Sequence, residues 1–184
     1  MGQYYRIAYD DGKIHINDLE VDGEGYLLGA KLMEHSYFGT KLMDSMCSVI
    51  YKKPTKVIWV GDYADEDDEV SDATSGDVTY DDVWGDDVDL NDVLKPVEFD
   101  YHQKYLVNHT KGVYISFDKY LDGGNDHEIH PLSILTCIGN GRGCGDYEDG
   151  SNMDYVGTWA WDEIEITDDA PDGMEELDIV FNED

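Results

Sequence analysis

The sequence predicts an α+β fold in which one amphipathic helix packs on a mainly antiparallel sheet. Three observations support this class. Clear helical periodicity occurs in one stretch only, at about residues 40–53, whereas about seven short stretches have the apolar runs or alternation of strands. Glycine and Asp-Gly turns separate several of these stretches, as they do in hairpins. The length of 184 residues is typical of one domain, so we expect a single domain over residues 1–184.

The N-terminal part predicts a hairpin followed by the helix. Residues 4–9 (YYRIAY) form the first expected strand, Asp10-Asp11-Gly12 is a turn signal, and KIHI is the returning strand. In the helix, Thr40 is the expected N-cap and Pro54 stops the chain from continuing. The apolar residues that share one face of this helix are Leu42, Met43, Met46, Val49 and Ile50.

The remaining strands are expected after the helix. Residues 55–60 (TKVIWV) predict a buried strand, and KYLV (104–107) with VYISF (113–117) predict a hairpin with a longer loop. Residues 132–138 (LSILTCI) predict another strand. Two or three more are expected between Val156 and Phe181, where TWAWDEIEI and LDIVF alternate as half-buried strands do.

The charge of the chain is concentrated in two segments of equal length. The whole sequence has 43 acidic and 12 basic residues, a net charge of −31. Residues 62–100 hold 16 acids and one base, residues 146–184 hold 15 acids and none, and the rest is nearly neutral. Adaptation to high salt would acidify the whole surface, so this distribution indicates a directed use of charge. The net negative charge repels phosphate and anionic lipid, which argues against direct nucleic-acid or membrane binding and favours a basic partner.

Neither acidic segment has the composition of a simple disordered tail. In residues 62–100 the carboxylates are interrupted by apolar side chains, which disordered acidic tracts lack. We therefore expect a partly mobile insert, packed in part on the body and mobile around residues 65–77. Residues 146–184 are expected to form acidic C-terminal strands.

Targeting features and cysteines indicate the cytoplasm. No stretch has the run of about 18 apolar residues that spans a membrane. The first residues, MGQYYRIAYDDGK, lack the basic and apolar regions of a secretory signal. The three cysteines are an odd, sparse set without a CxxC pair, which fits a reducing compartment.

The motifs that could carry catalysis or metal binding are weak. The glycine-rich run Gly139–Gly145 lacks the P-loop Lys-Ser/Thr and the GxGxxG spacing, and acids follow it, so a structural turn is favoured over a phosphate site. Loops starting at Asp118 and at Asp168 fail the EF-hand pattern. His127 and His130 are three residues apart, not four, and no cysteine pair supports zinc. We predict no catalytic residue, metal ligand or cofactor.

Six stretches of the sequence carry a family resemblance: MGQYYR (1–6), KLMEHS (31–36), VIWVGDYAD (57–65), KYLVNHT (104–110), GNGRGCGDY (139–147) and VGTWAWD (156–162). They resemble a family of small acidic proteins from gut bacteria and their phages. This family is similar to type II-A anti-CRISPR proteins, which are encoded on mobile elements and inhibit Cas9. The longer acidic stretch that follows GDYAD here departs from the family pattern.

The resemblance implies a non-enzymatic inhibitor in the cytoplasm of a bacterial host. Its expected partner is Cas9, with or without guide RNA, whose positive channels would accept carboxylates in place of phosphates. Trp84 is either an interface anchor or a staple between the acidic segment and the body. The predicted partner-binding residues are Asp65, Glu66, Asp67, Asp68, Glu69, Tyr80, Asp81, Asp82, Trp84, Asp86, Asp87, Asp89 and Asp92.

Two alternatives remain open from the sequence. One is an enzyme that uses the Gly139–Gly145 loop and nearby carboxylates, with or without a divalent metal. The other is an acidic chaperone or sequestering protein for a different basic partner.

Overall fold

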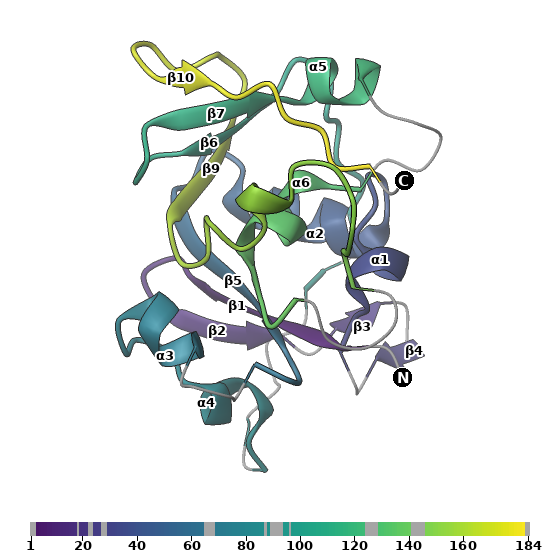
Figure 1. Cartoon of the computed structure of the whole chain (residues 1–184), viewed down its shortest axis with the longest axis vertical. Coiled ribbons are helices and arrows are strands. Elements are labelled where there is room, and N and C mark those ends of the chain that lie inside the picture. The colour runs from purple at the N-terminus through teal and green to yellow at the C-terminus, as the bar shows by residue number, and fades with distance from the viewer. Residues whose placement is uncertain are drawn as a thin grey trace.

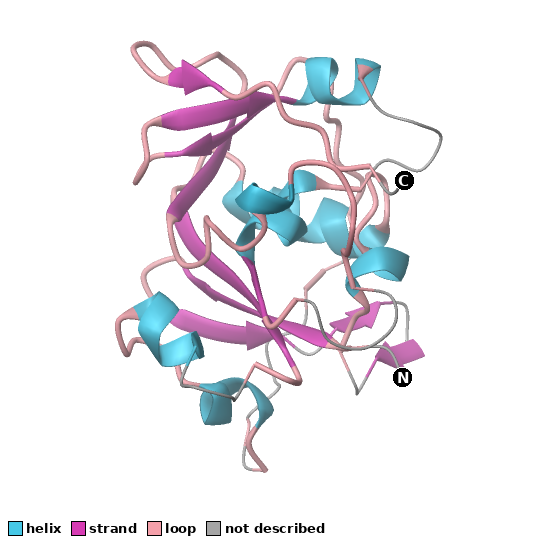
Figure 2. Cartoon of the chain, viewed as in Figure 1, coloured by secondary structure: helices cyan, strands magenta, loops and turns pink. Residues whose placement is uncertain are grey.

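The fold is known from a computed structural model (Figure 1). It describes residues 3–17, 19–21, 24–26, 29–64, 69–86, 88, 94–95, 97–123, 129–140 and 146–182. The described residues combine helices with a large, mainly antiparallel sheet, as Figure 2 shows, so the predicted α+β class is confirmed.

The main sheet has eight strands in the order β10-β7-β6-β9-β5-β1-β2, with β8 also paired to β5. Two pairings are parallel, β5 with β8 and β10 with β7, and the others are antiparallel. A second, two-stranded sheet consists of β3 (Leu19–Val21) and β4 (Glu24–Tyr26). The main-sheet strands are β1 (Tyr5–Asp10), β2 (Ile14–Asn17), β5 (Thr55–Gly61), β6 (Tyr105–Asn108), β7 (Val113–Ser116), β8 (Cys137–Ile138), β9 (Glu163–Thr167) and β10 (Glu175–Glu176).

The predicted helix is α2 (Lys41–Ile50), and its predicted cap is confirmed. The Thr40 hydroxyl accepts a hydrogen bond from the Met43 backbone N–H at 3.4 Å. The helix ends before the predicted boundary, because Tyr51 is extended and Lys52 has a positive φ of 55°. The other helices are α1 (Leu32–His35), α3 (Glu69–Thr74), α4 (Tyr80–Trp84), α5 (Phe117–Asp122), α6 (Pro131–Thr136) and the 3-10 turn η2 (Met153–Tyr155).

The strand predicted over residues 132–138 is wrong for most of its length. Helix α6 occupies Pro131–Thr136, and only Cys137–Ile138 form a strand. Proline at the first helical position suits a helix start, and the buried His130 side chain caps it by accepting from the Leu132 N–H at 3.1 Å. A short apolar run does not distinguish a buried helix from a buried strand, which explains the error.

The strands predicted near the C-terminus are shorter than expected. Of TWAWDEIEI (158–166) only Glu163–Ile166 lie in a strand, as part of β9, because the chain turns before them, with Trp161 at positive φ. LDIVF forms no strand, although Ile179 and Phe181 are buried in the main core as its alternation requires. The alternation correctly indicated which side chains face inward, but not whether a strand neighbour exists.

Each face of the central strands buries its own hydrophobic cluster. The main core contains Ile7, Val57 and Trp59, together with side chains from α2 and α6. The opposite face carries the second cluster: Ala8, Ile58 and Val60 from β1 and β5, with Ala64, Val70, Val78, Val83 and Trp161. Figure 1 shows α3 and α4 beside β1 and β2, away from α2 and α6. The acidic segment therefore supplies a layer of the fold.

Candidate functional site

The described part of the first acidic segment is built around a buried turn between α3 and α4. Val70 and Thr74 of α3 are buried, as is Val78 in the turn. The Thr74 hydroxyl accepts from the Val78 N–H at 3.1 Å and lies 2.9 and 2.7 Å from the carbonyl oxygens of Val70 and Val78. Mobility was expected around residues 65–77. Residues 65–68 lie outside the described residues, and residues 69–77 form α3 and this turn.

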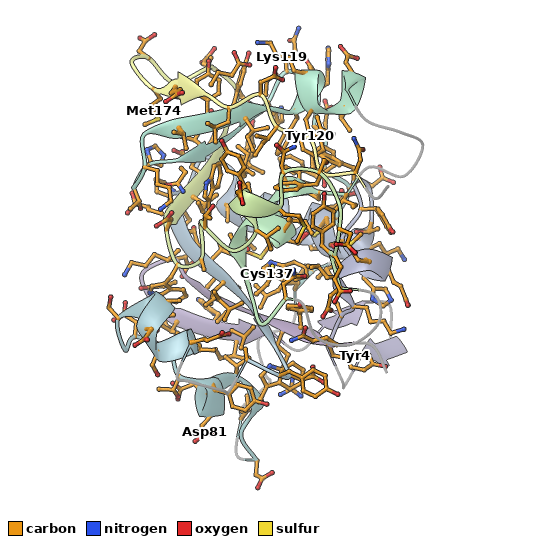
Figure 3. All side chains as sticks on the ribbon, in the orientation of Figure 1. Tyr4, Asp81, Lys119, Tyr120, Cys137 and Met174 are labelled. Carbon is orange, nitrogen blue, oxygen red and sulfur yellow. The ribbon has the colours of Figure 1, made fainter. Side chains whose placement is uncertain are left out.

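Helix α4 begins with a capping box, which fixes the carboxylates of its first turn. The Thr79 hydroxyl accepts from the Asp82 N–H at 3.2 Å, and the Asp82 carboxylate accepts from the Thr79 N–H at 2.8 Å. Val83 is fully buried in the second cluster. Asp82, one of the predicted contact residues, therefore also has a structural role. Figure 3 shows Asp81 of the same turn at the edge of the molecule, pointing outward.

Two predicted aromatic residues hold this layer against the sheet. The Tyr80 hydroxyl donates to the Asp62 carbonyl oxygen at 2.9 Å, and the Trp84 ring N–H donates to the Val60 carbonyl oxygen at 3.0 Å. The Arg6 guanidinium lies 4.2 Å from the centre of the Trp84 ring and donates to the Val83 carbonyl oxygen at 2.8 Å. The half-buried Trp84 has the contacts expected of a staple, with Arg6 as a partner that the sequence did not indicate.

Apart from Asp77, the exposed carboxylates of this layer have no basic partners in the described residues. The Asp77 carboxylate is 3.0 Å from the Lys56 ammonium and accepts from the Trp161 ring N–H at 2.9 Å. These two contacts, the tryptophan first, lower the pKa of Asp77.

Of the predicted contact residues, seven lie outside the described residues: Asp65, Glu66, Asp67, Asp68, Asp87, Asp89 and Asp92. The exposed carboxylates that the structure describes without an ion pair on α3, α4 and the turn after it are Glu69, Asp72, Asp81, Asp82 and Asp86; we call Glu69, Asp72, Asp81 and Asp86 the open carboxylates.

Asp72 was missed as a site residue. It lies three positions after Glu69, so the two share a face of α3, and this spacing could have indicated it. The described contact carboxylates lie on two short helices and on the turn after α4. On a helix, neighbours three or four residues apart have Cβ atoms about 5–6 Å apart.

In the second acidic segment several carboxylates pair with basic side chains of the scaffold. Asp168 lies 2.6 Å from the Lys52 ammonium and 3.3 Å from that of Lys104, and it accepts from the Tyr51 hydroxyl at 2.7 Å. These contacts, Lys52 first, hold the pKa of Asp168 well below its ordinary value. Three more carboxylates are paired in the same way: Asp162 with Lys111 at 3.0 Å, Glu165 with His109 at 2.7 Å and Glu176 with Lys119 at 2.6 Å.

The glycine-rich loop has a structural role where the structure describes it. Gly139 has a positive φ of 93°, and a Cβ there would lie 2.9 Å from the Ala64 side chain. The Asn140 amide donates to the Tyr147 carbonyl oxygen at 2.8 Å and accepts from the Tyr147 N–H at 3.0 Å, as a strand neighbour would. Residues 141–145 lie outside the described residues.

A buried cysteine and histidine form a contact without access to a substrate. Cys47 Sγ lies 3.3 Å from His130 Nε2, and both residues are fully buried, so Cys47 is a residue of the core. Burial lowers the pKa of His130 to about 3 and raises that of the Cys47 thiol, so both groups are neutral at pH 7. Among the described residues, no group of three or more His, Cys, Asp or Glu side chains could hold a metal ion, and His127 is outside them.

No family model matches this chain, and neither a curated protein nor a solved structure does. None of the helices in the described ranges has the length and apolar character needed to cross a membrane.

Proposed function

We propose that this protein is a non-enzymatic inhibitor that binds a basic, nucleic-acid-handling protein through the carboxylates of residues 62–100. One observation supports this most strongly. The open carboxylates Glu69, Asp72, Asp81 and Asp86 are exposed and have no basic partner among the described residues. In the second acidic segment Asp168, Asp162 and Glu176 are matched by lysines, whereas Glu148, Asp154, Asp169 and Asp172 have no ion pair among the described residues and provide the control below. The uncompensated charge is the charge available to a partner.

Preorganisation of the acidic layer supports the same proposal. Val70, Val78 and Val83 are buried on the sheet, and the Thr79 capping box fixes the start of α4. Carboxylates held in this way lose little conformational entropy on binding, in contrast to those of a disordered tail. The layer therefore combines a fixed shape with a high density of negative charge.

Repulsion between the carboxylates of the acidic layer favours binding of cationic groups. Like charges on neighbouring positions of a helix destabilise it. A partner that brings arginine and lysine to these carboxylates removes that repulsion and adds attraction. Each exposed pair contributes little, at most about 1 kcal/mol. Several together give fast association that weakens as salt is added.

We propose Cas9 as the partner on the basis of the sequence resemblance. Cas9 holds its RNA–DNA heteroduplex in a positively charged channel, which a folded polyanion can enter. The inhibitor would then act by partial nucleic-acid mimicry, in the cytoplasm of the bacterial host. Blocked nucleic-acid binding and blocked cleavage are both possible outcomes of such a contact, and the assay below separates them.

The experiment uses two variants with the same change in charge. The first carries Glu69→Gln, Asp72→Asn, Asp81→Asn and Asp86→Asn, and it leaves Asp82 in place because Asp82 caps α4. The control carries Glu148→Gln, Asp154→Asn, Asp169→Asn and Asp172→Asn, which are exposed acids of the second segment without ion pairs among the described residues. Purified Cas9, with and without guide RNA, is assayed for retention of each variant, DNA binding and DNA cleavage.

We expect the first variant to lose most of its retention and inhibition, and the control to keep both. Equal loss in both variants would show a response to net charge alone. Absence of Cas9 retention by the unmodified protein at low salt would contradict Cas9 as the partner, and a pull-down from bacterial lysate would then test other basic proteins.

A further inference from the structure

Strand β2 is one edge of the main sheet. It pairs with β1 on one side, and no other described strand lies on its second side. Along an antiparallel strand, the backbone N–H and C=O groups of successive residues point alternately to one side and to the other. An edge strand therefore presents every second residue to its open side. The register of β2 with β1 identifies which residues these are.

The side of β1 that faces β2 is identified by the contacts of Tyr5. Its N–H donates to the Ala30 carbonyl oxygen at 2.7 Å, and its carbonyl oxygen accepts from the Ala30 N–H at 2.8 Å. Ala30 and β5 lie on opposite sides of β1, so Tyr5 directs both groups to the side on which β2 lies. Because the groups alternate along the strand, Ile7 and Tyr9 direct theirs to the same side.

The backbone groups of Ile14 and Ile16 therefore point to the open side of β2. Asn17 and His15 are the register partners of these two residues of β1 and use their backbone groups to bond to it. Ile14 and Ile16 alternate with them, and their N–H and C=O groups have no partner among the described residues. The edge thus offers donors and acceptors in the spacing that a further strand requires.

The acidic layer adjoins this edge. Ile16 packs against the second cluster, which also contains side chains of α3 and α4. Ile14 lies on the same face of β2 and is 39 % exposed. Figure 1 shows α3 beside β2, and α3 carries the open carboxylates Glu69 and Asp72. A strand added to this edge would have one face toward negative charge and toward an exposed aliphatic side chain.

We infer that the open edge of β2 binds an extended, basic peptide segment of the partner, which adds a strand to the sheet. Main-chain hydrogen bonds hold such a segment, and its alternate side chains point to the face that carries α3. Lysine and arginine suit these positions, because their methylene stems pack on apolar surface such as Ile14 while their charged ends reach carboxylates. The net charge of −31 disfavours a second copy of this chain as the occupant.

The inference rests on the proposed function for the class of partner, but β2 lies outside both acidic segments, so different variants test the two. The quadruple variant at the open carboxylates tests the proposed function through retention of Cas9. If that variant retains Cas9 while a basic peptide still pairs with β2, the proposed function alone fails. If the quadruple variant loses Cas9 while no peptide pairs with β2, the inference about the edge alone fails.

The test uses the full chain and a short capped peptide of alternating lysine and valine, with hydrogen exchange of single amides followed by NMR. In the free protein we expect the Ile14 and Ile16 amides to exchange much faster than those of His15 and Asn17. The peptide is expected to slow exchange at Ile14 and Ile16 and to leave the other two nearly unchanged. Slow exchange at Ile14 and Ile16 before the peptide is added would show that another segment or a second copy already occupies the edge. That result, or unchanged fast exchange with saturating peptide, would overturn the inference.

Two control peptides separate main-chain pairing from charge attraction. The first has the same side chains with every backbone nitrogen methylated, so it keeps its charge but has no N–H to donate. We expect it to bind about tenfold more weakly, as the loss of one or two hydrogen bonds predicts. The second alternates glutamate and valine, and we expect it not to bind. Equal binding of the methylated peptide would show charge attraction alone and would contradict pairing with the edge.

Matched variants at one position complete the test. Ile14→Pro removes an N–H that points to the open side and no bond to β1, a change that edge strands tolerate. Ile14→Thr alters the side chain but keeps this N–H. We expect Ile14→Pro to weaken peptide binding about tenfold and Ile14→Thr to weaken it less, with urea unfolding as the check that both variants fold. Equal weakening by the two folded variants would contradict a main-chain contact at Ile14.

Discussion

The two acidic segments have the same length and nearly the same number of acids, but the fold uses their charge differently. In the second segment Asp162, Asp168 and Glu176 neutralise lysines that come from α5, from the turn after α2 and from the residues on either side of β6. In the first segment Asp77 alone, among its described acids, has an ion pair, and valines hold the segment on the sheet. Composition alone therefore does not locate a charged surface, because the charge available to a partner is what remains after internal pairing.

The largest effect on stability is expected from the buried valines that hold the first segment on the sheet. Val83→Ala removes a fully buried side chain from the second cluster and is expected to cost about 2 kcal/mol of unfolding free energy. Val97→Ala, in the same segment but exposed, is expected to change stability by less than about 0.5 kcal/mol. Urea unfolding followed by circular dichroism measures both. Similar small effects would mean that the layer does not contribute to folding.

A smaller effect is expected from the cap of α4. Thr79→Ala removes the hydroxyl that accepts from the Asp82 N–H, and such losses cost about 1 kcal/mol. Thr79→Ser keeps the acceptor and is the control. If the two variants were equally stable in urea, the capping box would not be what orders the carboxylates of this helix.

In the second segment, the contribution of Asp168 to stability is expected to depend on pH. Its pKa is lowered in the folded state from an ordinary value of 3.8, so its pairing stabilises the protein above that pH and the stabilisation is lost as the pH falls below about 4. Asp168→Asn is expected to lower the melting temperature at pH 7, and the difference in melting temperature from the unmodified protein is expected to become smaller below pH 4. Thermal unfolding across this pH range measures this difference. A difference that stays constant with pH would mean that the contacts of Asp168 with Lys52 and Lys104 do not depend on its charge.

The smallest effect is expected for single open carboxylates. Asp81→Asn has no ion pair to lose among the described residues and reduces repulsion, so stability is expected to rise or stay within about 0.5 kcal/mol. Added salt should reduce any gain, because it screens the same repulsion. A clear loss of stability in Asp81→Asn would reveal an attractive contact of this carboxylate and remove it from the open set.

Local signals in the sequence predicted much of the fold. Thr40 and the apolar spacing after it located α2, and the Asp-Gly turn located the first hairpin, because these features act over a few residues. The failure at residues 132–138 came from weighting an apolar run above Pro131, which marks a helix start. Whether LDIVF has a strand neighbour depends on distant residues, and the sequence does not encode that locally.

The candidate site was predictable only in part. The charge count identified residues 62–100, and the interrupting valines indicated that the segment packs on the body. The pairing that separates open from matched carboxylates was not predictable, since Asp168 meets Lys52 and Lys104 from positions far away in the chain. The contact of Arg6 with Trp84 was missed for the same reason.

The binding surface is tested by measuring the dissociation constant for Cas9 over a salt series, with the unmodified protein and the two charge-matched quadruple variants. The unmodified protein and the second-segment variant are expected to bind with similar affinity and the same steep dependence on salt. The variant at Glu69, Asp72, Asp81 and Asp86 is expected to bind more weakly and with a shallower dependence, because it forms fewer charge contacts. Identical affinities and salt dependences for the two variants would contradict the claim that the open carboxylates form the binding surface.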